Sequence, residues 1–325
     1  MNTVLLTGGA GYIGSHISRE LLKEDYNVII VDDLSSGRKD FIPSGVEFFE
    51  GDFSDTRILE KIHSENKPDV VMHMAANISV EESMKNPSLY FQTNLYKSME
   101  LLNFMIKKKI RNIVFSSTGM VYSNPKKFPI TEEEKTMPSN EYGMTKLMFE
   151  NALEYYRNIH GINFYSLRYF NASGADKSGM IGECHKPETH LIPLVLDVAL
   201  GRRKEIKIYG TDYDTKDGTC MRDYIHVLDI AKAHIICSSA LINGKKGGFY
   251  NVGSGSGHTV REIIEVCREV TGHKIPEAIA PRREGDPPIM VTSHDKISRE
   301  FGWKPENSDI KNIIKTAWEW HKKNN

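Results

Sequence analysis

The chain has 325 residues, enough for about two domains at the usual ~150 residues each. Hydrophobic residues make up 39% and charged residues 26%, ordinary globular values that argue against wholesale disorder. Lys and Arg total 42 against 43 Asp and Glu, a net charge of −1, so no broad cationic field indicates a nucleic acid or an anionic membrane surface as partner.

Targeting signals and cysteine pairs are missing from the sequence. The start of the chain has no basic region, and the apolar run 191–200 is too short for a membrane helix. The four cysteines stand far apart with no Cys-x-x-Cys pair, which indicates neither a zinc knuckle nor a disulfide framework. We therefore expect a reduced, cytoplasmic protein without a membrane partner and without a metal centre. The cysteines are Cys184, Cys220, Cys237 and Cys267.

The first half alternates short β-branched runs with helical stretches. Alternation of this kind predicts an α/β fold with a Rossmann-type, doubly wound parallel sheet. The expected strands are Thr3–Thr7, Asn27–Val31, Glu47–Glu50, Val70–Met74 and Asn112–Ser116. The expected helices include Ser15–Glu24, Tyr90–Lys107 and Ser139–Asn158, the last with Ser139 or Asn140 at its N-cap and Gly161 just past its end.

After about residue 172 the composition of the sequence changes, and loops rich in Gly, Asp and Pro become frequent. Strand-like Asn163–Phe170 and Phe249–Val252, with helix-like Val227–Leu241, still fit the first sheet. We therefore expect a dinucleotide-binding domain of residues 1–172 plus about 223–252. A smaller, discontinuous C-terminal substrate domain would take about 173–222 plus 253–325.

A glycine-rich turn separates the first strand from the first helix. Gly8, Gly11 and Gly14 let the backbone turn tightly and approach a pyrophosphate at a helix N-terminus. Asp32 ends the second strand, 18 residues after Gly14, where a carboxylate accepts from a ribose 2′-OH and repels a 2′-phosphate. A strand, a glycine turn, a helix and an acidic residue in this order predict a dinucleotide-binding site. The carboxylate of Asp32 favours NAD over NADP, although nearby Arg38 leaves NADP open.

The spacing Tyr-x-x-x-Lys occurs twice, as Tyr122/Lys126 and Tyr142/Lys146. Pro125 inside the first pair indicates a turn, whereas the second pair lies on a predicted helix, where i and i+4 share a face. An ammonium beside a tyrosine favours the phenolate, which can act as a base. Ser116-Ser117-Thr118 ends a predicted strand and adds hydroxyls where open α/β sheets bind ligands.

Together these features resemble the extended short-chain dehydrogenase/reductase superfamily and, within it, the UDP-galactose (UDP-glucose) 4-epimerases. The likeness runs over nearly the whole chain, and its more specific parts lie downstream of the glycine turn. The matching stretches are 7–16, Glu141-Tyr142-Gly143-Met144-Thr145-Lys146, Arg168-Tyr169-Phe170-Asn171, Asp217-Gly218-Thr219, Arg222-Asp223-Tyr224-Ile225-His226 and 280–286.

The resemblance implies an isomerase in which NAD stays bound. Tyr142 as phenolate would remove the proton of the sugar 4-OH while C4 gives hydride to NAD. The 4-keto sugar would then rotate and take hydride back on its other face. Lys146 would hold the nicotinamide ribose and lower the pKa of Tyr142, and Thr118 would hydrogen-bond the 4-OH.

The resemblance also implies ligand contacts and a homodimer formed through two helices per subunit, one of them the Tyr142/Lys146 helix. For NAD the residues are Gly8, Gly11, Tyr12, Ile13, Gly14, Asp32, Asp52, Phe53, Asn94, Tyr142, Lys146 and Phe170. For the UDP-sugar they are Thr118, Tyr142, Asn171, Leu191, Tyr209, Arg222, Arg283, Asp286 and Met290.

Four positions depart from the family pattern. Many members have Lys where Ile78 stands, a small or hydroxyl residue at Met120, and Gly at Ser123. Met290 stands where side-chain bulk helps set tolerance for a 2-acetamido group, so the breadth of substrates stays open.

Three alternatives remain. One is a 4-epimerase of a UDP-N-acetylhexosamine, UDP-pentose or UDP-uronate. Another is a 4,6-dehydratase, which the sequence disfavours because Gly119 and Met120, instead of an Asp-Glu pair, follow Thr118. The third is a dinucleotide-binding regulator without turnover, which would have no need of Tyr142, Lys146 and Thr118 together.

Overall fold

The computed structural model describes residues 1–122, 125–283 and 286–324. Contacts along the chain divide it into two compact units. The first comprises Met1–Ser123, Lys135–Arg168 and Ala231–Tyr250, and the second Asn124–Glu134, Tyr169–Ile230 and Asn251–Asn325.

This division by contacts differs from the expected domains, because residues 125–134, 169–172, 223–230 and 251–252 fall in the second unit. Ile130 explains the first difference, since it bridges to Thr292 and its N–H donates to the carbonyl of Val291 at 2.8 Å. Pairing of strand β7 (Asn171–Ser173) with strand β9 (Met221–His226) explains the next two.

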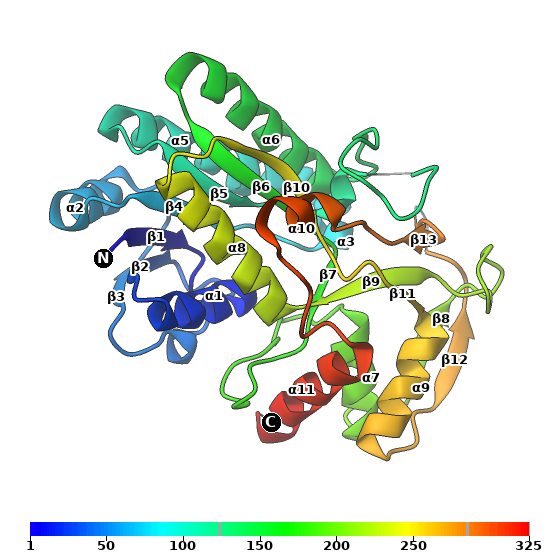
Figure 1. Cartoon of the computed structure of the whole chain (residues 1–325). Coiled ribbons are helices and arrows are strands. Elements are labelled where there is room, and N and C mark those ends of the chain that lie inside the picture. Colours follow the sequence, from blue (N-terminus) through cyan, green and yellow to red (C-terminus); the bar gives the residue numbers. More distant parts are fainter. Residues whose placement is uncertain (123–124, 284–285, 325) are drawn as a thin grey trace. The chain divides into compact units, whose positions relative to one another are not determined.

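A seven-stranded sheet forms the centre of the first unit, with strand order β10-β6-β5-β4-β1-β2-β3 (Figure 1). The five pairs from β6 to β3 are all parallel. The strands are β1 (Thr3–Thr7), β2 (Asn27–Asp32), β3 (Glu47–Glu50), β4 (Val70–His73), β5 (Asn112–Ser116), β6 (Asn163–Tyr169) and β10 (Gly247–Val252). The predicted strands are thus present, with ends moved by no more than two residues.

Helices cover both faces of this sheet, which confirms the expected doubly wound α/β fold (Figure 1). Helices α2, α5 and α6 lie on one face over a core that includes Leu5, Phe115 and Phe149, and α1 and α8 lie on the other. The helices are α1 (Tyr12–Lys23), α2 (Thr56–Asn66), α3 (Val80–Lys85), α4 (Pro87–Tyr90), α5 (Lys97–Lys108), α6 (Glu141–His160) and α8 (Val227–Ile242), with short turns η1 (Lys39–Phe41), η2 (Phe91–Tyr96) and η3 (Gly119–Val121).

The expected helix Tyr90–Lys107 is interrupted, because η2 takes π-helical geometry between α4 and α5. Asn94 lies in this π segment, buried, and its side chain exchanges two hydrogen bonds with the backbone of Asn77. The distances are 2.8 Å from the Asn77 N–H to Oδ1 and 2.9 Å from Nδ2 to the Asn77 carbonyl. π-Helical turns are frequent at functional sites.

The second unit packs three helices against short strands. Helices α7, α9 and α11 enclose an apolar core that includes Ile192, Ile264 and Ile313. Strands β11, β9 and β13 form a sheet that β7 joins, and β8 pairs in parallel with β12. The elements are α7 (Leu191–Ala199), β8 (Ile206–Tyr209), β11 (Gly257–Thr259), α9 (Val260–Thr271), β12 (Glu277–Ala280), β13 (Ile289–Met290), α10 (Asp295–Phe301) and α11 (Ile310–Lys323).

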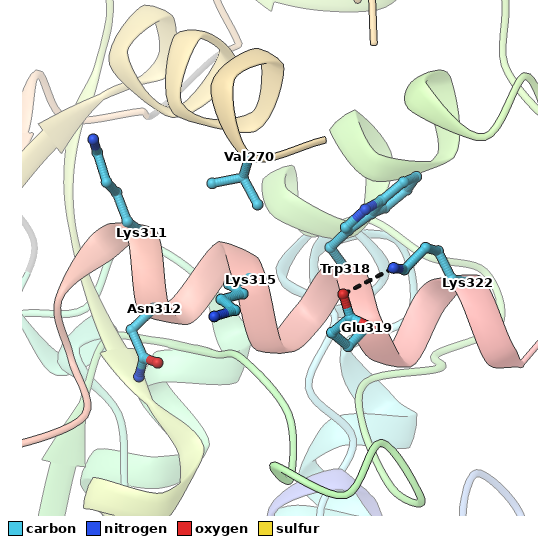
Figure 2. Close-up of a pocket in the computed structure, with 7 residues that line it drawn as sticks. All are labelled: Val270, Lys311, Asn312, Lys315, Trp318, Glu319 and Lys322. Atoms are coloured by element: carbon cyan, nitrogen blue, oxygen red, sulfur yellow. Dashed lines mark hydrogen bonds and ion pairs between the residues drawn. The ribbon is translucent and has the colours of Figure 1, made fainter. Parts of the chain in front are cut away.

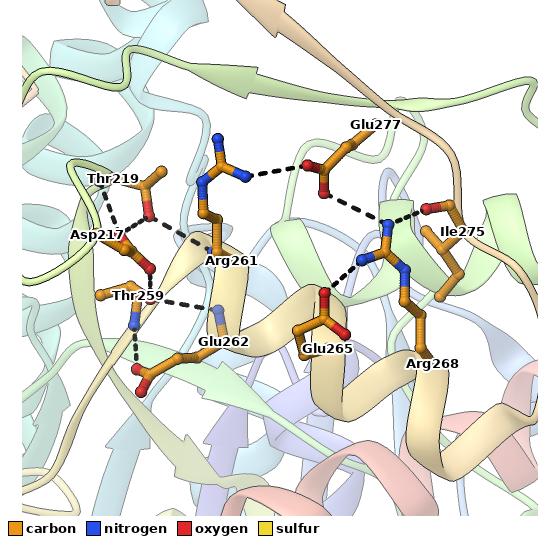
Figure 3. A network of polar contacts seen from close by, with 9 residues as sticks. All are labelled: Asp217, Thr219, Thr259, Arg261, Glu262, Glu265, Arg268, Ile275 and Glu277. Carbon is orange, nitrogen blue, oxygen red and sulfur yellow. Dashed lines mark hydrogen bonds and ion pairs between the residues drawn. The ribbon is translucent and has the colours of Figure 1, made fainter.

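A polar network fixes the start of α9 (Figure 3). Thr259 and Glu262 form a capping box, which satisfies free N–H groups of the first turn. Asp217 accepts from the Thr259 hydroxyl at 2.5 Å and from the Thr219 hydroxyl at 2.7 Å. The stretch Asp217-Gly218-Thr219 therefore anchors helix α9.

In the described parts of the chain, no helix is long and apolar enough to cross a membrane. All four cysteines are free thiols.

Candidate active site

The glycine turn after β1 forms a cradle that only glycine fits. Gly8 has a φ of +71°, and a Cβ there would lie 2.7 Å from the backbone nitrogen of Ala75. A Cβ on Gly14 would lie 2.2 Å from the Gly8 carbonyl oxygen. Gly11 is the N-cap of α1 and brings no side chain to that end of the helix. The free backbone N–H groups of the first turn of α1 therefore stay accessible to an anion.

Asp32 lies at the carboxyl end of β2 beside this cradle. Its carboxylate accepts from the backbone N–H groups of Ala10 and Leu34, both at 2.9 Å. Burial raises the pKa of Asp32, and these two hydrogen bonds offset part of the rise. Arg38 forms an ion pair with Asp40, with Nε 3.0 Å from Oδ1, so its guanidinium already has an acidic partner.

Asp52 and Phe53, which follow β3, have different environments. Asp52 pairs with Lys97 at 2.5 Å, and its pKa is lowered because the Lys97 and Ser54 hydrogen bonds outweigh the desolvation that raises it. Phe53 belongs to the core, with its ring centroid 5.0 Å from that of His73. The first residue stands in a polar setting, whereas the second contributes mainly to packing.

Tyr142 and Lys146 lie one turn apart in helix α6, as the spacing predicted. The helix begins after Asn140, whose side chain accepts from the N–H of Gly143 at 2.8 Å, and it ends at Gly161 in the left-handed region. Lys146 is 2% exposed, and its Nζ lies 6.0 Å from the centroid of the Tyr142 ring. The same Nζ donates to the carbonyl of Ser116 at 2.8 Å.

Thr118 joins this pair from the loop after β5. Its hydroxyl oxygen accepts from the N–H of Met120 at 3.1 Å, which begins the short turn η3. A Cβ on Gly143 would lie 2.4 Å from the Met120 carbonyl oxygen, so glycine at 143 lets α6 approach this turn closely. The glycine between Tyr142 and Lys146 thus has a packing role.

Burial shifts the pKa values of both Tyr142 and Lys146. Desolvation raises the pKa of Tyr142 to about 12, and hydrogen bonding with Thr118 offsets part of the rise. Desolvation lowers the pKa of Lys146 to about 7, with the negative charge of Glu150 acting in the opposite direction. Strongly perturbed groups that sit together are typical of functional sites.

The sequence did not predict a buried ion pair one helical turn after Lys146, between Glu150 of α6 and Arg168. Arg168 and Glu150 are both buried, with Nη2 2.6 Å from Oε2 and Nε 2.9 Å from Oε1. Nη1 of Arg168 also donates to the hydroxyl of Tyr122 at 2.8 Å. Tyr122, the tyrosine of the other Tyr-x-x-x-Lys pair, is therefore a core residue. A Glu on the inner face of the helix, four residues after Lys146, was the available signal.

Three of the expected substrate residues come together in the second unit. Arg222 in β9 stands opposite Met290 in β13 in the parallel register. Its Nη2 lies 3.2 Å from Oδ1 of Asp286, and its Nη1 donates to the Pro287 carbonyl at 2.8 Å. Met290 is 3% exposed. A cation, a carboxylate and an apolar side chain are thus adjacent.

The other expected substrate residues are spread over neighbouring elements of the same unit. The Arg283 guanidinium carbon lies 4.0 Å from the centroid of the Tyr209 ring. Asn171 donates from Nδ2 to the Asp223 carbonyl at 2.8 Å. Leu191 is the first residue of α7. Phe170, which is expected at NAD and not at the substrate, is partly buried just before β7.

Two of the four positions that depart from the family pattern lie in the first unit, among the residues that the structure describes. Ile78 is exposed, and Met120 belongs to η3. Ser123 lies outside the described residues, as do Glu284 and Gly285 of the stretch 280–286.

A pocket of about 500 Å³ lies along α11 of the second unit (Figure 2). Val270 and Trp318 contribute its apolar part. Lys311 is paired with Glu269 at 2.7 Å, and Lys322 with Glu319 at 2.8 Å. No residue predicted to bind NAD or UDP lines it, so we do not assign it to the active site.

Comparison with known proteins decides the family. The model of the NAD dependent epimerase/dehydratase family matches residues 4–253. The chain belongs to this family. A UDP-glucose 4-epimerase of Halalkalibacterium halodurans is 46% identical over 319 residues, which cover 98% of this chain and 95% of the relative.

Solved structures of family members agree over almost the whole chain. A UDP-glucose 4-epimerase from Brucella ovis in complex with NAD has a TM-score of 0.95 and 40% identity, with 98% of each chain covered. One from Bifidobacterium longum in complex with NAD+ and UDP has a TM-score of 0.93 and 39% identity, with 99% of each chain covered. The family fold therefore extends across both units of this chain.

Proposed function

We propose that this chain interconverts UDP-galactose and UDP-glucose by NAD-dependent epimerisation at C4 of the hexose, through a transient 4-keto sugar. The observation that carries the proposal is the group of Tyr142, Lys146 and Thr118. A phenol, a buried amine and a hydroxyl meet there at the carboxyl edge of the sheet. Full-length relatives that carry the name UDP-glucose 4-epimerase support the substrate class.

The first unit fits NAD. A Cβ on Gly8 or Gly14 would collide with the backbone, so glycine at these positions lets the turn pack tightly, and Gly11 leaves the N-terminus of α1 without a side chain where a pyrophosphate would bind. Asp32 ends β2 with a carboxylate suited to ribose hydroxyls. When bound, NAD supplies a hydride acceptor and donor. The residues of this unit that would hold it are Gly8, Gly11, Tyr12, Ile13, Gly14, Asp32, Asp52, Phe53, Asn94, Tyr142 and Lys146. Phe170, also expected at NAD, belongs to the second unit.

Tyr142 takes the proton of the sugar 4-OH and later returns it, while Thr118 holds the same hydroxyl. A phenol with a pKa of about 12 is a weak base at neutral pH, so the phenolate needs positive charge close by. The charged form of Lys146 supplies part of it, because its Nζ lies 6.0 Å from the ring centroid. Lys146 thus has two tasks, to bind ribose hydroxyls and to favour the phenolate.

The second unit binds the UDP group. Arg222 and Arg283 engage the diphosphate, because guanidinium groups form paired hydrogen bonds with phosphate oxygens. Asp286 accepts from ribose hydroxyls, and Tyr209 offers a flat ring beside Arg283. Asn171, Leu191 and Met290 complete the set. Met290 next to Arg222 limits the bulk of the sugar substituent.

We also infer that the chain forms a homodimer through helix α6. An apolar strip on this helix faces solvent, with Tyr155 70% and Ile159 73% exposed and Met144 and Met148 also exposed. Unpartnered apolar strips of this kind indicate an interface. The four free cysteines agree with the reducing cytoplasm as its location.

The test adds UDP-galactose to the purified protein without NAD and follows UDP-glucose by chromatography. We expect turnover from retained NAD, and a loss of about 10²- to 10⁴-fold in Tyr142→Phe, because general acid–base catalysis contributes that much. Tyr26→Phe is the matched control, since Tyr26 lies between α1 and β2, at the amino end of the strand. Wild-type protein that stays inactive even with NAD supplied would refute the proposal.

A further inference from the structure

Four possible metal ligands come together in the segment between β7 and α7. Glu183, His185, Glu188 and His190 each offer one ligand atom, and all four atoms lie within 4.8 Å of one another. In the described parts of the chain, no other set of three or more His, Cys, Asp or Glu side chains converges this closely. All four residues belong to the second unit.

The spacing of the ligand atoms suits a tetrahedral ion. Nδ1 of His190 lies 2.8 Å from Oε1 of Glu183 and 2.8 Å from Oε1 of Glu188. Nδ1 of His185 lies 3.3 Å from Oε1 of Glu183 and 3.8 Å from Oε2, the other carboxylate oxygen, of Glu188. Zinc at its usual bond lengths holds neighbouring ligand atoms about 3.4 Å apart. The observed distances lie on both sides of that value, so small side-chain movements would complete the geometry.

The surrounding structure fixes the positions of two of the ligands. Trp320 of α11 donates from Nε1 to the Glu183 carbonyl at 2.9 Å. A Cβ on Gly182 would lie 2.4 Å from the Trp320 ring, so the chain passes tightly over this side chain. Oε1 of Glu188 accepts from the N–H groups of Thr189 and His190, both at 2.8 Å. Such supporting contacts orient metal ligands in known sites.

We propose that Glu183, His185, Glu188 and His190 form a structural zinc site. The bound ion holds the segment before α7 in its folded conformation. Two imidazoles and two carboxylates suit Zn²⁺, whereas Mg²⁺ and Ca²⁺ prefer oxygen ligands alone. The two carboxylates balance the charge of the dication. Four protein ligands leave no open position for a substrate, which is typical of a structural site.

This site is separate from the proposed reaction. None of its four residues is assigned to NAD or to the UDP-sugar, although His190 is the N-cap of α7 and immediately precedes Leu191. His190 makes no side-chain hydrogen bond to the helix that it caps, and its ring faces Glu183 and Glu188 instead. A bound ion would therefore secure the start of α7.

The experiment measures zinc directly in full-length protein from which any affinity tag has been removed. Protein is dialysed against metal-free buffer, incubated with ZnCl₂ and freed of excess metal, and its zinc content is measured by mass spectrometry. We expect one zinc ion per chain and a higher melting temperature with zinc than with a chelator. Cobalt should give the visible absorption bands of a tetrahedral site.

Variants at the site and away from it make the test specific. His190→Gln and His185→Gln should each lose most of the bound zinc and the zinc-dependent rise in melting temperature. His273→Gln, on the exposed turn after α9, should keep both. Far-ultraviolet circular dichroism checks that the variants fold, and Glu188→Gln replaces any variant that does not. Zinc content far below one per chain in the wild type, or equal zinc in the wild type and every folded site variant, would overturn the proposal.

Discussion

The ammonium of Lys146 donates a 2.8 Å hydrogen bond to the main-chain carbonyl of Ser116, the last residue of strand β5. This contact ties helix α6 to the carboxyl edge of the central sheet, two residues before Thr118. Because the amine is buried there, its pKa falls to about 7, with Glu150 opposing the fall. The contact that positions the amine therefore also makes its charge sensitive to pH near neutrality.

The first prediction concerns stability and pH in nucleotide-free protein. Between pH of about 7 and the ordinary value of 10.5, Lys146 is neutral in the folded chain and protonated in the unfolded chain. The unfolded state then binds more protons, so this residue's contribution to stability rises with pH. The free energy of unfolding of wild type minus that of Lys146→Met should increase by about 1.4 kcal/mol per pH unit in this window.

Urea denaturation at several pH values measures that difference. Lys232→Met, at an exposed lysine of helix α8, serves as the control for the substitution itself. A Lys146→Met difference that stays flat from pH 7 to pH 9 would show that the amine keeps an ordinary pKa in the folded chain.

The second prediction concerns the ion pair of Arg168 and Glu150, both buried. Arg168→Met leaves the Glu150 carboxylate with Ser166 as its remaining hydrogen-bond donor at 2.7 Å, and it should cost about 3–5 kcal/mol of unfolding free energy. The exposed pair of Lys23 and Glu20 is the matched control, and Glu20→Gln should cost no more than about 1 kcal/mol. Equal losses in urea denaturation would contradict the expected dependence on burial.

The third prediction concerns the choice of NAD over NADP, and it depends on the proposed function. Asp32→Ser removes the carboxylate that would repel a 2′-phosphate, and Asp40→Asn releases Arg38 from its ion pair. The double variant should raise the ratio of NADP to NAD affinity by at least about tenfold, since removing a like-charge contact is worth more than 1.4 kcal/mol. Titration calorimetry of nucleotide-free protein measures both affinities.

Asp33→Ser provides the control for that experiment, because Asp33 is the exposed neighbour of Asp32. Its ratio should equal that of the wild type. An unchanged ratio in the double variant would mean that Asp32 does not select the cofactor.

Features set by short stretches of sequence were predictable. Strands β1 and β5 have the expected ends, because buried parallel strands are short apolar runs bounded by polar residues. Strand β3 also has the expected ends, although none of its four residues is buried. Helix α6 was predictable because its start and stop signals, Asn140 and Gly161, lie within the segment itself. The glycine turn and Asp32 follow from the same local logic.

Features that depend on distant partners were not predictable. Asp217 accepts from Thr259, 42 residues away, and nothing in the local sequence names that partner. Ile130 joins the second unit through Thr292 in the same way. The π-helical turn at Asn94 depends on hydrogen bonds to Asn77, so helical periodicity alone could not show it.

The expectation of no metal centre came from looking for cysteine pairs. The dense run of His and Glu at 183–190 was the signal for the ligand cluster.

The last prediction concerns the sugar substituent at C2. Met290 is 3% exposed and stands opposite Arg222 in the parallel register, so its side chain fills space beside the expected diphosphate site. Met290→Ala should raise kcat/KM for UDP-N-acetylglucosamine relative to UDP-glucose by tenfold or more. The smaller side chain leaves space for an acetamido group, and a fit of this kind changes transition-state binding by about 1–3 kcal/mol. It should also lower the free energy of unfolding by about 2–5 kcal/mol.

Met290→Leu distinguishes volume from chemistry, since leucine keeps nearly the same volume and should leave the substrate ratio unchanged. Both variants are compared with wild type on the two substrates in parallel coupled assays. If Met290→Ala loses stability but keeps the wild-type ratio, Met290 is a packing residue of β13 and the limit on the C2 substituent lies elsewhere. If both variants shift the ratio equally, the thioether and not the bulk of the side chain sets the preference.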